Sequence, residues 1–134
     1  MNELTGRVIG AAIEVHRHLG PGLLESAYEQ CLTFELGARD IAFERQVPLP
    51  LKYRGHYLDC GYIMDLVVER QLILELKSVE QLLPIHEAQV LTYLRLSHHP
   101  LALLFNFNTV LLKHGLRRFA LTDLAYSAPS APLR

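Results

Sequence analysis

Two short apolar segments, separated by three polar residues, constrain the fold of this chain more than any other feature. Residues 62–68 and 72–77 have the composition of β-strands, and Glu-Arg-Gln at 69–71 leaves room only for a tight turn. In a hairpin centred on Arg70, residues at equal distances from Arg70 face each other. One face then carries six apolar side chains: Met64, Leu66, Val68, Leu72, Leu74 and Leu76. This pattern predicts a strand pair that packs one face against a core.

The other face of the same hairpin brings two acidic residues together. Asp65 faces Glu75, and Lys77 lies two residues beyond Glu75 on the same face. A shift of the pairing by one residue would move Asp65 into the apolar layer, so the apolar pattern itself supports this register. The sequence therefore predicts a group of three charged side chains within a largely apolar sheet.

Opposed carboxylates repel each other, so either their pKa values rise or a cation lies between them. Mg²⁺ and Mn²⁺, which are hard ions with oxygen ligands, meet that need. Lys77 could then hold a water molecule or hydroxide and stabilise a phosphorane-like transition state, which suits phosphodiester hydrolysis. The alternative is a plain salt bridge of Lys77 with Asp65 or Glu75 on an exposed face, because structural ion pairs are common.

The N-terminal part of the chain has helical periodicity. Residues 3–19 read as an amphipathic helix because apolar residues recur at helical spacing: Leu4, Val8, Ala12, Val15 and Leu19. Gly20-Pro21-Gly22 ends this helix, and a second helix is expected from about Leu23 to Ala38. The two helices form a predicted helical hairpin.

Strand and helix signals alternate in the rest of the chain. Strands are expected at 43–53 and 56–60, with Arg54-Gly55 as a turn and with Pro48 and Pro50 marking an edge strand. A helix from Pro84 to about Leu96 precedes an apolar strand at 101–107, and a last strand is expected at 116–121.

The expected order of elements is α-α-β-β-β-β-α-β-β. It predicts an α/β domain over residues 1–124, with a mixed, mainly antiparallel sheet and an α crossover between residues 72 and 107. Residues 125–134, which contain Pro129 and Pro132, are expected to be a disordered tail.

Two helical pairs of polar residues are further site candidates. Gln89 and Tyr93 are four residues apart and share a stripe of their helix, where they can orient a water molecule or a phosphate oxygen. Glu25 and Tyr28 share a face at the start of the second helix, and Glu25 can act as a further metal ligand. The simpler alternatives are a half-buried tyrosine beside a solvated glutamine, and a glutamate that complements the helix dipole.

Basic residues form two clusters that could contact a nucleic-acid backbone. The denser cluster contains Lys113, His114, Arg117 and Arg118, and the other contains Lys52, Arg54 and His56. Most such clusters are solvated surface, so each is a weak signal. The whole chain has 13 Lys and Arg against 14 Asp and Glu, a net charge of −1, which argues against a polybasic binder.

The sequence predicts no membrane partner. Apolar runs fall short of the roughly 20 residues that span a bilayer, and Glu3, Arg7 and Glu14 do not fit a signal peptide. Cys31 and Cys60 lack the spacing of a zinc site and suit a reducing compartment. We therefore expect a cytoplasmic protein.

Several of these motifs together resemble one nuclease superfamily. Asp65 followed by Glu75-Leu76-Lys77 resembles the Asp…Glu-x-Lys signature of the PD-(D/E)xK superfamily, and residues 22–28, Gly-Leu-Leu-Glu-Ser-Ala-Tyr, resemble the motif that names its GxxExxY family. Further agreement lies in Glu87-Ala88-Gln89 with Tyr93, in residues 104–108 and in residues 115–119. The first motif is weak alone, whereas the combination, in order from the first helix to about Leu121, is specific.

This resemblance implies a restriction-endonuclease-like fold and a divalent-metal site. Asp65 and Glu75 would hold Mg²⁺ or Mn²⁺, and Lys77 would position or activate the attacking water. Glu25 would complete the acidic set, and Gln89 and Tyr93 would act beside the metal as in exonuclease-like members.

The chain departs from the resemblance at two positions. Met64 stands where the superfamily name has Pro, and Ile63 stands where we expect the family to carry Arg. The candidate nucleic-acid contacts are Tyr28, Lys113, Arg117 and Arg118.

The sequence leaves three functions open. The leading hypothesis is a metal-dependent nuclease that hydrolyses phosphodiester bonds of DNA, with RNA as the alternative substrate. The second is a nuclease-like scaffold that binds nucleic acid or protein without turnover, which the near-neutral charge and Ile63 favour. The third is a structural subunit of a larger complex. A homodimer suits the first two, because a chain of 134 residues has little surface for gripping a duplex.

Overall fold

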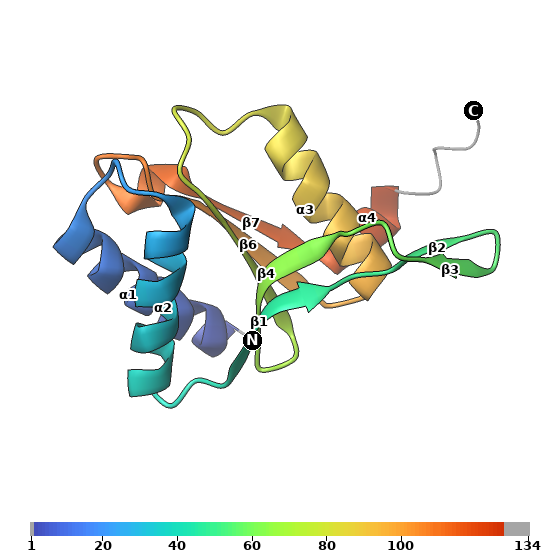
Figure 1. The fold of residues 1–134 in the computed structure, drawn as a ribbon, viewed down its shortest axis with the longest axis horizontal. Coiled ribbons are helices and arrows are strands. Elements are labelled where there is room, and N and C mark those ends of the chain that lie inside the picture. Colours follow the sequence, from blue (N-terminus) through green and yellow to red (C-terminus); the bar gives the residue numbers. More distant parts are fainter. Residues whose placement is uncertain (1, 128–134) are drawn as a thin grey trace.

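A five-stranded mixed sheet lies at the centre of the fold (Figure 1). The computed structural model describes residues 2–127. The strand order is β1-β4-β5-β6-β7, formed by Phe43–Pro48, Ile63–Val68, Leu72–Lys77, Leu101–Asn106 and Leu116–Ala120. β5 and β6 run parallel, whereas the other neighbouring strands are antiparallel. The predicted mixed, mainly antiparallel sheet is confirmed, with β1 at an edge as its prolines indicated.

Helices cover both faces of this sheet (Figure 1). On one face, α1 (Asn2–Leu19) and α2 (Glu25–Ala38) form the predicted helical hairpin. α3 (Pro84–Ser97) links β5 to β6 across the other face, where α4 (Leu121–Ser127) joins it, and the short 3-10 helix η1 (Leu112–Gly115) precedes β7. Within residues 2–127, no helix combines the length and the apolar composition needed to cross a membrane.

The β4–β5 hairpin has the predicted register over its paired part, from Val68↔Leu72 to Leu66↔Leu74. Five of the six residues predicted for the core face are buried with α1 and α2: Leu66, Val68, Leu72, Leu74 and Leu76. The prediction is wrong for Met64, which packs under α3 with Val67 and Ile73. The pairing of β4 with β5 ends at Leu66, and its pairing with β1 is interrupted between Leu66 and Met64, opposite Gln46 with its φ of 50°. The alternation of side chains is therefore broken at this point.

Gly20-Pro21-Gly22 reverses the chain between α1 and α2, as expected. Gly20 and Gly22 have φ angles of 67° and 100°, in the left-handed region where glycine has no steric penalty. The hydroxyl of Tyr28 donates a hydrogen bond to the Gly20 carbonyl (2.5 Å) and accepts one from the Leu23 amide (3.2 Å). A side chain of α2 therefore holds the turn closed, and α2 begins at Glu25 rather than at Leu23.

Two segments differ from the prediction. The segment 43–53 is divided into β1 and the short β2 (Leu51–Tyr53), because Pro48 and Pro50 have no N–H to donate; β2 pairs with β3 (His56–Leu58). Helix α4 was not expected, and Leu121 and Leu124 pack it against the cluster under α3. Residues 125–127, predicted to be disordered, are helical, and residues 128–134 of the predicted tail lie outside the described residues.

Candidate metal and catalytic site

Strands β4 and β5 part at the two predicted acidic residues. Backbone pairing ends at Leu66↔Leu74. One residue further, the Asp65 amide donates a hydrogen bond to Glu75 Oε2 (2.8 Å), and the Leu76 amide donates one to Asp65 Oδ2 (2.8 Å). Each carboxyl group therefore takes the place of a backbone carbonyl in the ladder and is fixed by the opposite strand.

Burial raises the pKa of both carboxyl groups. Glu75 is 3% exposed; burial first, and then the negative charge of Asp65, raises its pKa from 4.5 to about 8. Burial likewise raises the pKa of Asp65 from 3.8 to about 6, and nearby Glu29 adds to this shift. The Lys77 ammonium opposes both increases without cancelling them. At neutral pH the pair as a unit therefore retains a proton that a bound cation would displace.

The donor atoms of this pair fit a hard divalent cation. Each carboxyl group uses one oxygen on a backbone amide, and its other oxygen has no hydrogen-bond partner among the described residues. Within residues 2–127, no group of three or more His, Cys, Asp or Glu side chains could hold a metal ion. Two carboxylates still suit Mg²⁺, which keeps several water ligands and binds through one or two carboxylates together with substrate phosphates.

Lys77 ends β5 and lines an open cavity. Asp65 and Glu75 do not line this cavity, but their charges act on Tyr93 in its wall. The cavity has a volume of about 350 Å³ and is also lined by Gln89, Tyr93 and Tyr62. Among the residues that the structure describes, Lys77 forms no ion pair with Asp65 or Glu75. The plain salt bridge considered as the alternative is therefore not formed, and the ammonium group is available to the cavity.

Tyr93 and Gln89 lie one turn apart on α3 and reach the same cavity. The Tyr93 ring is 4% exposed and packs edge-on against Tyr62, with 6.4 Å between ring centres. Burial, followed by the charges of Glu75 and Asp65, raises the pKa of the Tyr93 hydroxyl. The structure thus places Gln89, Tyr93 and Lys77 around one cavity. The spacing on α3 predicted only that Gln89 and Tyr93 share a stripe of their helix.

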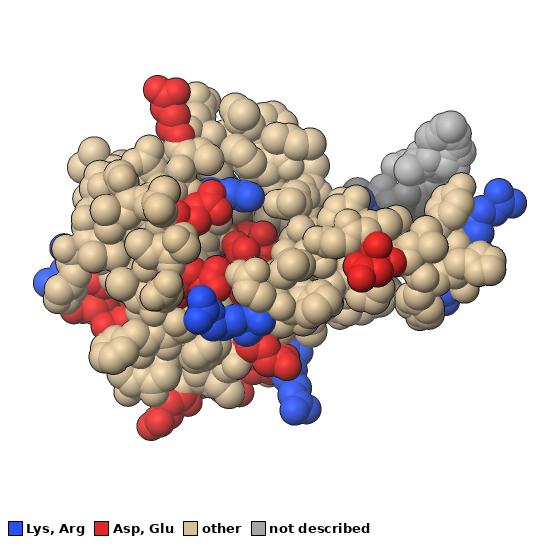
Figure 2. Space-filling view, viewed as in Figure 1, with Lys and Arg blue, Asp and Glu red and all other residues tan. Residues whose placement is uncertain are grey.

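Two glutamates of α2 approach the carboxyl pair from the other side. Glu25 is exposed in the first turn, and its negative charge contributes to the raised pKa values of Asp65 and Glu75. Glu29, one turn further, is 8% exposed and was not singled out from the sequence. Its four-residue spacing from Glu25 was the available signal. Figure 2 shows acidic side chains in a hollow near the middle of the molecule, with basic side chains beside them.

Partners from β1 hold Glu29 in place. Arg45 Nη2 lies 3.1 Å from Glu29 Oε2, and Gln46 Nε2 donates to both carboxylate oxygens at 3.0 and 3.1 Å. Gln46 has a φ of 50°, an uncommon conformation for a residue other than glycine. Two residues of the edge strand therefore hold the buried Glu29 carboxylate in one position. From that position its charge acts on Asp65.

A family model described as the PD-(D/E)XK nuclease superfamily matches residues 2–119. The chain belongs to this superfamily. The match runs from α1 into β7 and includes every residue of the site described above. No curated protein and no solved structure matches the chain. PD-(D/E)XK nucleases generally use divalent metal ions and act on nucleic acids, and the α/β fold with its five-stranded mixed sheet agrees with their restriction-endonuclease-like architecture. Membership of the GxxExxY family stays a prediction from residues 22–28.

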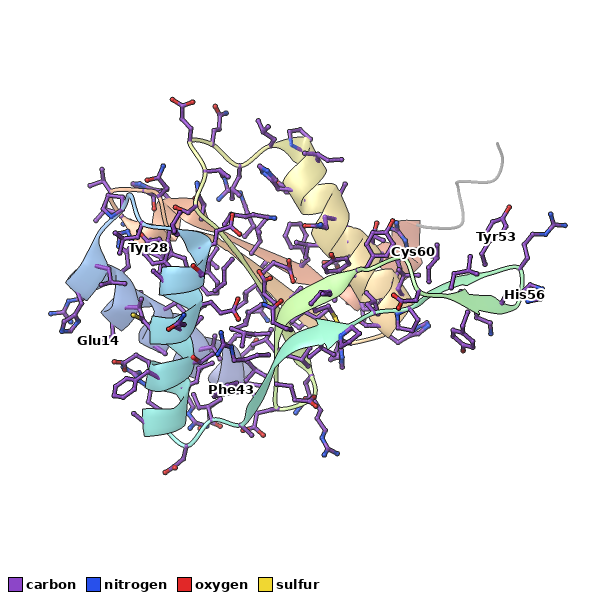
Figure 3. The ribbon with its side chains drawn as sticks, in the orientation of Figure 1. Glu14, Tyr28, Phe43, Tyr53, His56 and Cys60 are labelled. Carbon is purple, nitrogen blue, oxygen red and sulfur yellow. The ribbon has the colours of Figure 1, made fainter. Side chains whose placement is uncertain are left out.

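One predicted contact residue of this PD-(D/E)XK protein is internal. Tyr28 has no exposed surface, and its ring stacks on Phe107 with 4.5 Å between ring centres. Figure 3 shows Tyr28 within the helical layer. Because its hydroxyl is also bonded at the Gly20 turn, Tyr28 is a structural residue, and its prediction as a nucleic-acid contact is wrong.

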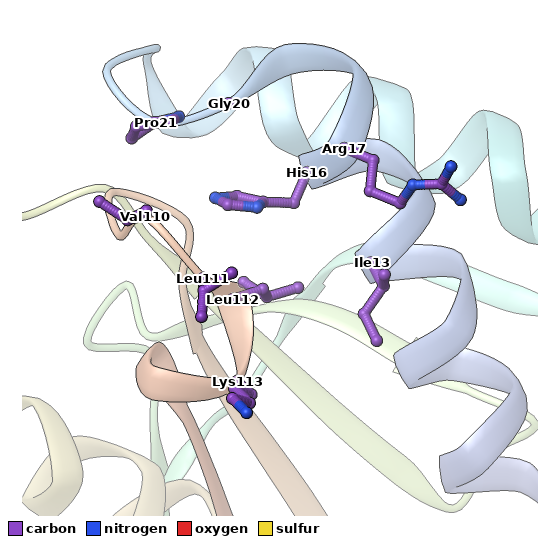
Figure 4. A pocket seen from close by; sticks show the side chains of 9 residues that line it. All are labelled: Ile13, His16, Arg17, Gly20, Pro21, Val110, Leu111, Leu112 and Lys113. Carbon is purple, nitrogen blue, oxygen red and sulfur yellow. The ribbon is translucent and has the colours of Figure 1, made fainter.

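The predicted basic cluster of this PD-(D/E)XK protein does not form one surface. Arg117 pairs with Leu104, which packs under α3, whereas Arg118 pairs with Leu103, on the face of α1 and α2. Arg118 Nη2 donates to Asn2 Oδ1 in α1 at 2.9 Å. Lys113 lines a separate cavity of about 520 Å³ between the end of α1 and the loop before β7 (Figure 4). These residues therefore lie in different places, and none of them lines the Lys77 cavity.

Proposed function

We propose that this protein is a divalent-metal-dependent nuclease that hydrolyses phosphodiester bonds of DNA, with Mg²⁺ or Mn²⁺ as its cofactor. One observation carries the proposal: Asp65 and Glu75 are fixed between parted strands, and among the described residues each keeps one oxygen without a hydrogen-bond partner. The charge of Lys77, which forms no ion pair with a described residue, acts on both groups. Membership of the PD-(D/E)XK superfamily supports the same chemistry.

Asp65 and Glu75 would hold the divalent ion, which when bound acts as a Lewis acid on the phosphate and lowers the pKa of water. Their fixed geometry means that little reorganisation is needed on binding. The ammonium group of Lys77 lies at the cavity wall, where it can hold the attacking water and offset negative charge that develops on the phosphate.

The helix residues would position the substrate. Gln89 offers an amide that can donate to a phosphate oxygen or accept from a water molecule. The raised pKa of Tyr93 keeps its hydroxyl protonated, so it acts as a hydrogen-bond donor in the same cavity. Glu25, exposed on α2 near both carboxyl groups, would supply a further ligand through water.

Titration calorimetry with Mn²⁺ tests the metal site without any choice of substrate. We expect wild type to bind, and Asp65→Asn and Glu75→Gln to lose binding while remaining folded. Glu80→Gln, which removes an exposed acid outside the site, is the matched control and should bind like wild type. Millimolar Mn²⁺ that produces no heat in wild type, even with phosphate present, would contradict the metal site.

Cleavage assays test the reaction. Lys77→Ala is expected to lower cleavage of labelled DNA by about 10²–10³-fold, the usual effect of removing one group that stabilises the transition state, without changing the unfolding midpoint. Arg70→Ala, which removes an exposed cation from the turn between β4 and β5, is the control. The same assay with RNA of equal sequence tests the preference for DNA, and undiminished cleavage by Lys77→Ala would refute its role.

One observation favours the second candidate, a nuclease-like scaffold that binds without turnover. Ile63 begins β4 next to the site and is 42% exposed, in the position where the resemblance led us to expect Arg. A cation is therefore missing near the proposed phosphate position. Mn²⁺ binding together with DNA binding, but with no cleavage under any metal, would favour this candidate over the nuclease.

A further inference from the structure

The β2–β3 hairpin projects from the body of the protein as a separate two-stranded sheet (Figure 1). Among the described residues, β2 and β3 pair only with each other. Arg54 and Gly55 form its turn with φ angles of 51° and 84°, the combination that matches the twist of a two-residue hairpin. A lone two-stranded hairpin is marginally stable in water, so a binding partner would add to its stability.

The side chains of this hairpin combine cations with aromatic rings. Lys52 pairs across the strands with Tyr57, and its Nζ lies 5.5 Å from the ring centre. Tyr53 pairs with His56, and Figure 3 shows both near the far end, beside the Arg54 turn. The rings of Tyr53 and Tyr57 are 60% and 70% exposed. A narrow ribbon with exposed cations fits phosphates and the major groove of a duplex.

Charge is divided unequally between this hairpin and the rest of the protein. Residues 51–58 contain Lys52 and Arg54 and no acidic residue. The rest of the chain is left with 11 Lys and Arg against 14 Asp and Glu. Because the 14 acidic residues, which include the carboxyl groups of the candidate site, all lie outside residues 51–58, a polyanion is repelled by the body and attracted by the hairpin.

The base of the hairpin adjoins the candidate site. Tyr62, whose carbonyl accepts the Leu49 amide at 2.8 Å, lines the Lys77 cavity, and Ile63 then begins β4. Ten residues separate Asp65 from Gly55, so an extended chain spans at most about 33 Å. That reach is close to one helical turn of DNA, about 34 Å. The tip can therefore contact the backbone up to one turn away from a phosphate at the site.

We propose that the β2–β3 hairpin is an arm that grips duplex DNA through its phosphates and groove, about one turn from the cleaved bond. This inference rests on the proposed nuclease function, and it identifies a second place at which the protein would hold its substrate. Lys52 and Arg54 supply the phosphate contacts, and Tyr57 holds the Lys52 ammonium in place. The arm provides the affinity for a polyanion that the acidic body lacks.

Fluorescence anisotropy with a labelled DNA duplex of about two helical turns (about 70 Å), in EDTA to prevent cleavage, tests the arm. Each phosphate contact contributes a factor of about 8 to affinity at 0.1 M salt. The double variant Lys52→Gln/Arg54→Gln is therefore expected to bind about 60-fold more weakly, and its log–log salt dependence should be shallower by about 1.8. The matched control Arg70→Gln/Arg95→Gln removes two exposed cations elsewhere and should bind like wild type.

Two further measurements separate failure of this inference from failure of the proposed function. Mn²⁺ binding and hydrolysis of bis(p-nitrophenyl) phosphate, which is too small to reach the arm, should be unchanged in the arm variant. If the arm variant hydrolyses the small ester normally and binds the duplex as tightly as wild type, the role of the arm is refuted and the proposed nuclease function stands. If wild type shows no detectable binding of the duplex, the role of the arm is also refuted, whether or not the small ester is hydrolysed. Sedimentation analysis adds a last outcome: a wild-type dimer that becomes monomeric in the arm variant makes the hairpin a dimer contact instead.

Discussion

Replacing Glu75 by glutamine is expected to change how the stability of the metal-free protein depends on pH. Glu75 is buried, with Oε2 accepting the Asp65 amide at 2.8 Å. Glutamine has nearly the same shape and keeps a carbonyl oxygen for that amide. The substitution therefore removes the titration of the group and leaves the packing and the hydrogen bond in place.

The sign and size of the effect follow from the raised pKa of Glu75. The group titrates at about 8 in the folded protein against an ordinary value of 4.5, because burial and Asp65 disfavour its charged form. Between these values the folded state holds a proton that the unfolded state releases, so the free energy of unfolding falls as pH rises, by about 1.4 kcal/mol per pH unit. Between pH 5.5 and pH 7.5 the free energy of unfolding of wild type should therefore fall by about 3 kcal/mol, a decrease that is absent in Glu75→Gln.

Urea denaturation followed by circular dichroism, with EDTA present, measures this difference. The two proteins should be similar at pH 5.5, and the variant should be the more stable at pH 7.5. Glu80→Gln is the control for removing an acid and should follow the wild-type dependence, because this position is exposed. A difference between wild type and Glu75→Gln that is equal at both pH values would refute the reasoning, since Glu75 would then ionise normally in the folded state.

Three other outcomes are expected. Mn²⁺ at about 100 times its dissociation constant should raise the free energy of unfolding by about 2.7 kcal/mol in wild type and not in Asp65→Asn, as measured by urea denaturation at pH 7.5. Tyr28→Phe should lower that free energy by about 1–3 kcal/mol, since two hydrogen bonds at the helix turn are lost, with duplex affinity by anisotropy unchanged. Leu74→Ala should lower it by about 2–5 kcal/mol because the side chain is fully buried; a loss below 1 kcal/mol in thermal or urea unfolding would contradict its core position.

The sheet and the acidic pair could be predicted because strand alternation is a strict physical rule. With one face of residues 62–77 apolar, a single register keeps Asp65 out of the core, and that register is observed. The same rule could have corrected the prediction that Arg117 and Arg118 belong to one basic cluster. Arg117 and Arg118 are consecutive in a strand, so they point to opposite faces.

Other features depend on contacts between distant segments and leave no local pattern. Glu29 is recognisable as part of the site only once Arg45 and Gln46 of β1 are seen to hold it. Tyr28 shares a helix face with Glu25 in sequence, yet its ring is buried and stacks on Phe107. Met64 lies on the face opposite to the predicted one, next to the interruption of the β1–β4 pairing at Gln46. In each case packing against another element decides the side chain's environment.

The distribution of charge suggests why the arm and the site are separate. Asp65 and Glu75, with Glu25 adding to both raised pKa values and Glu29 to that of Asp65, make a place that attracts a divalent cation and repels a phosphate until that cation is bound. A site built in this way cannot also supply affinity for the substrate backbone. Further cations placed beside it would repel the metal ion and compete with it for the same carboxylates. Basic residues on a separate ribbon attract the polyanion without competing for these carboxylates.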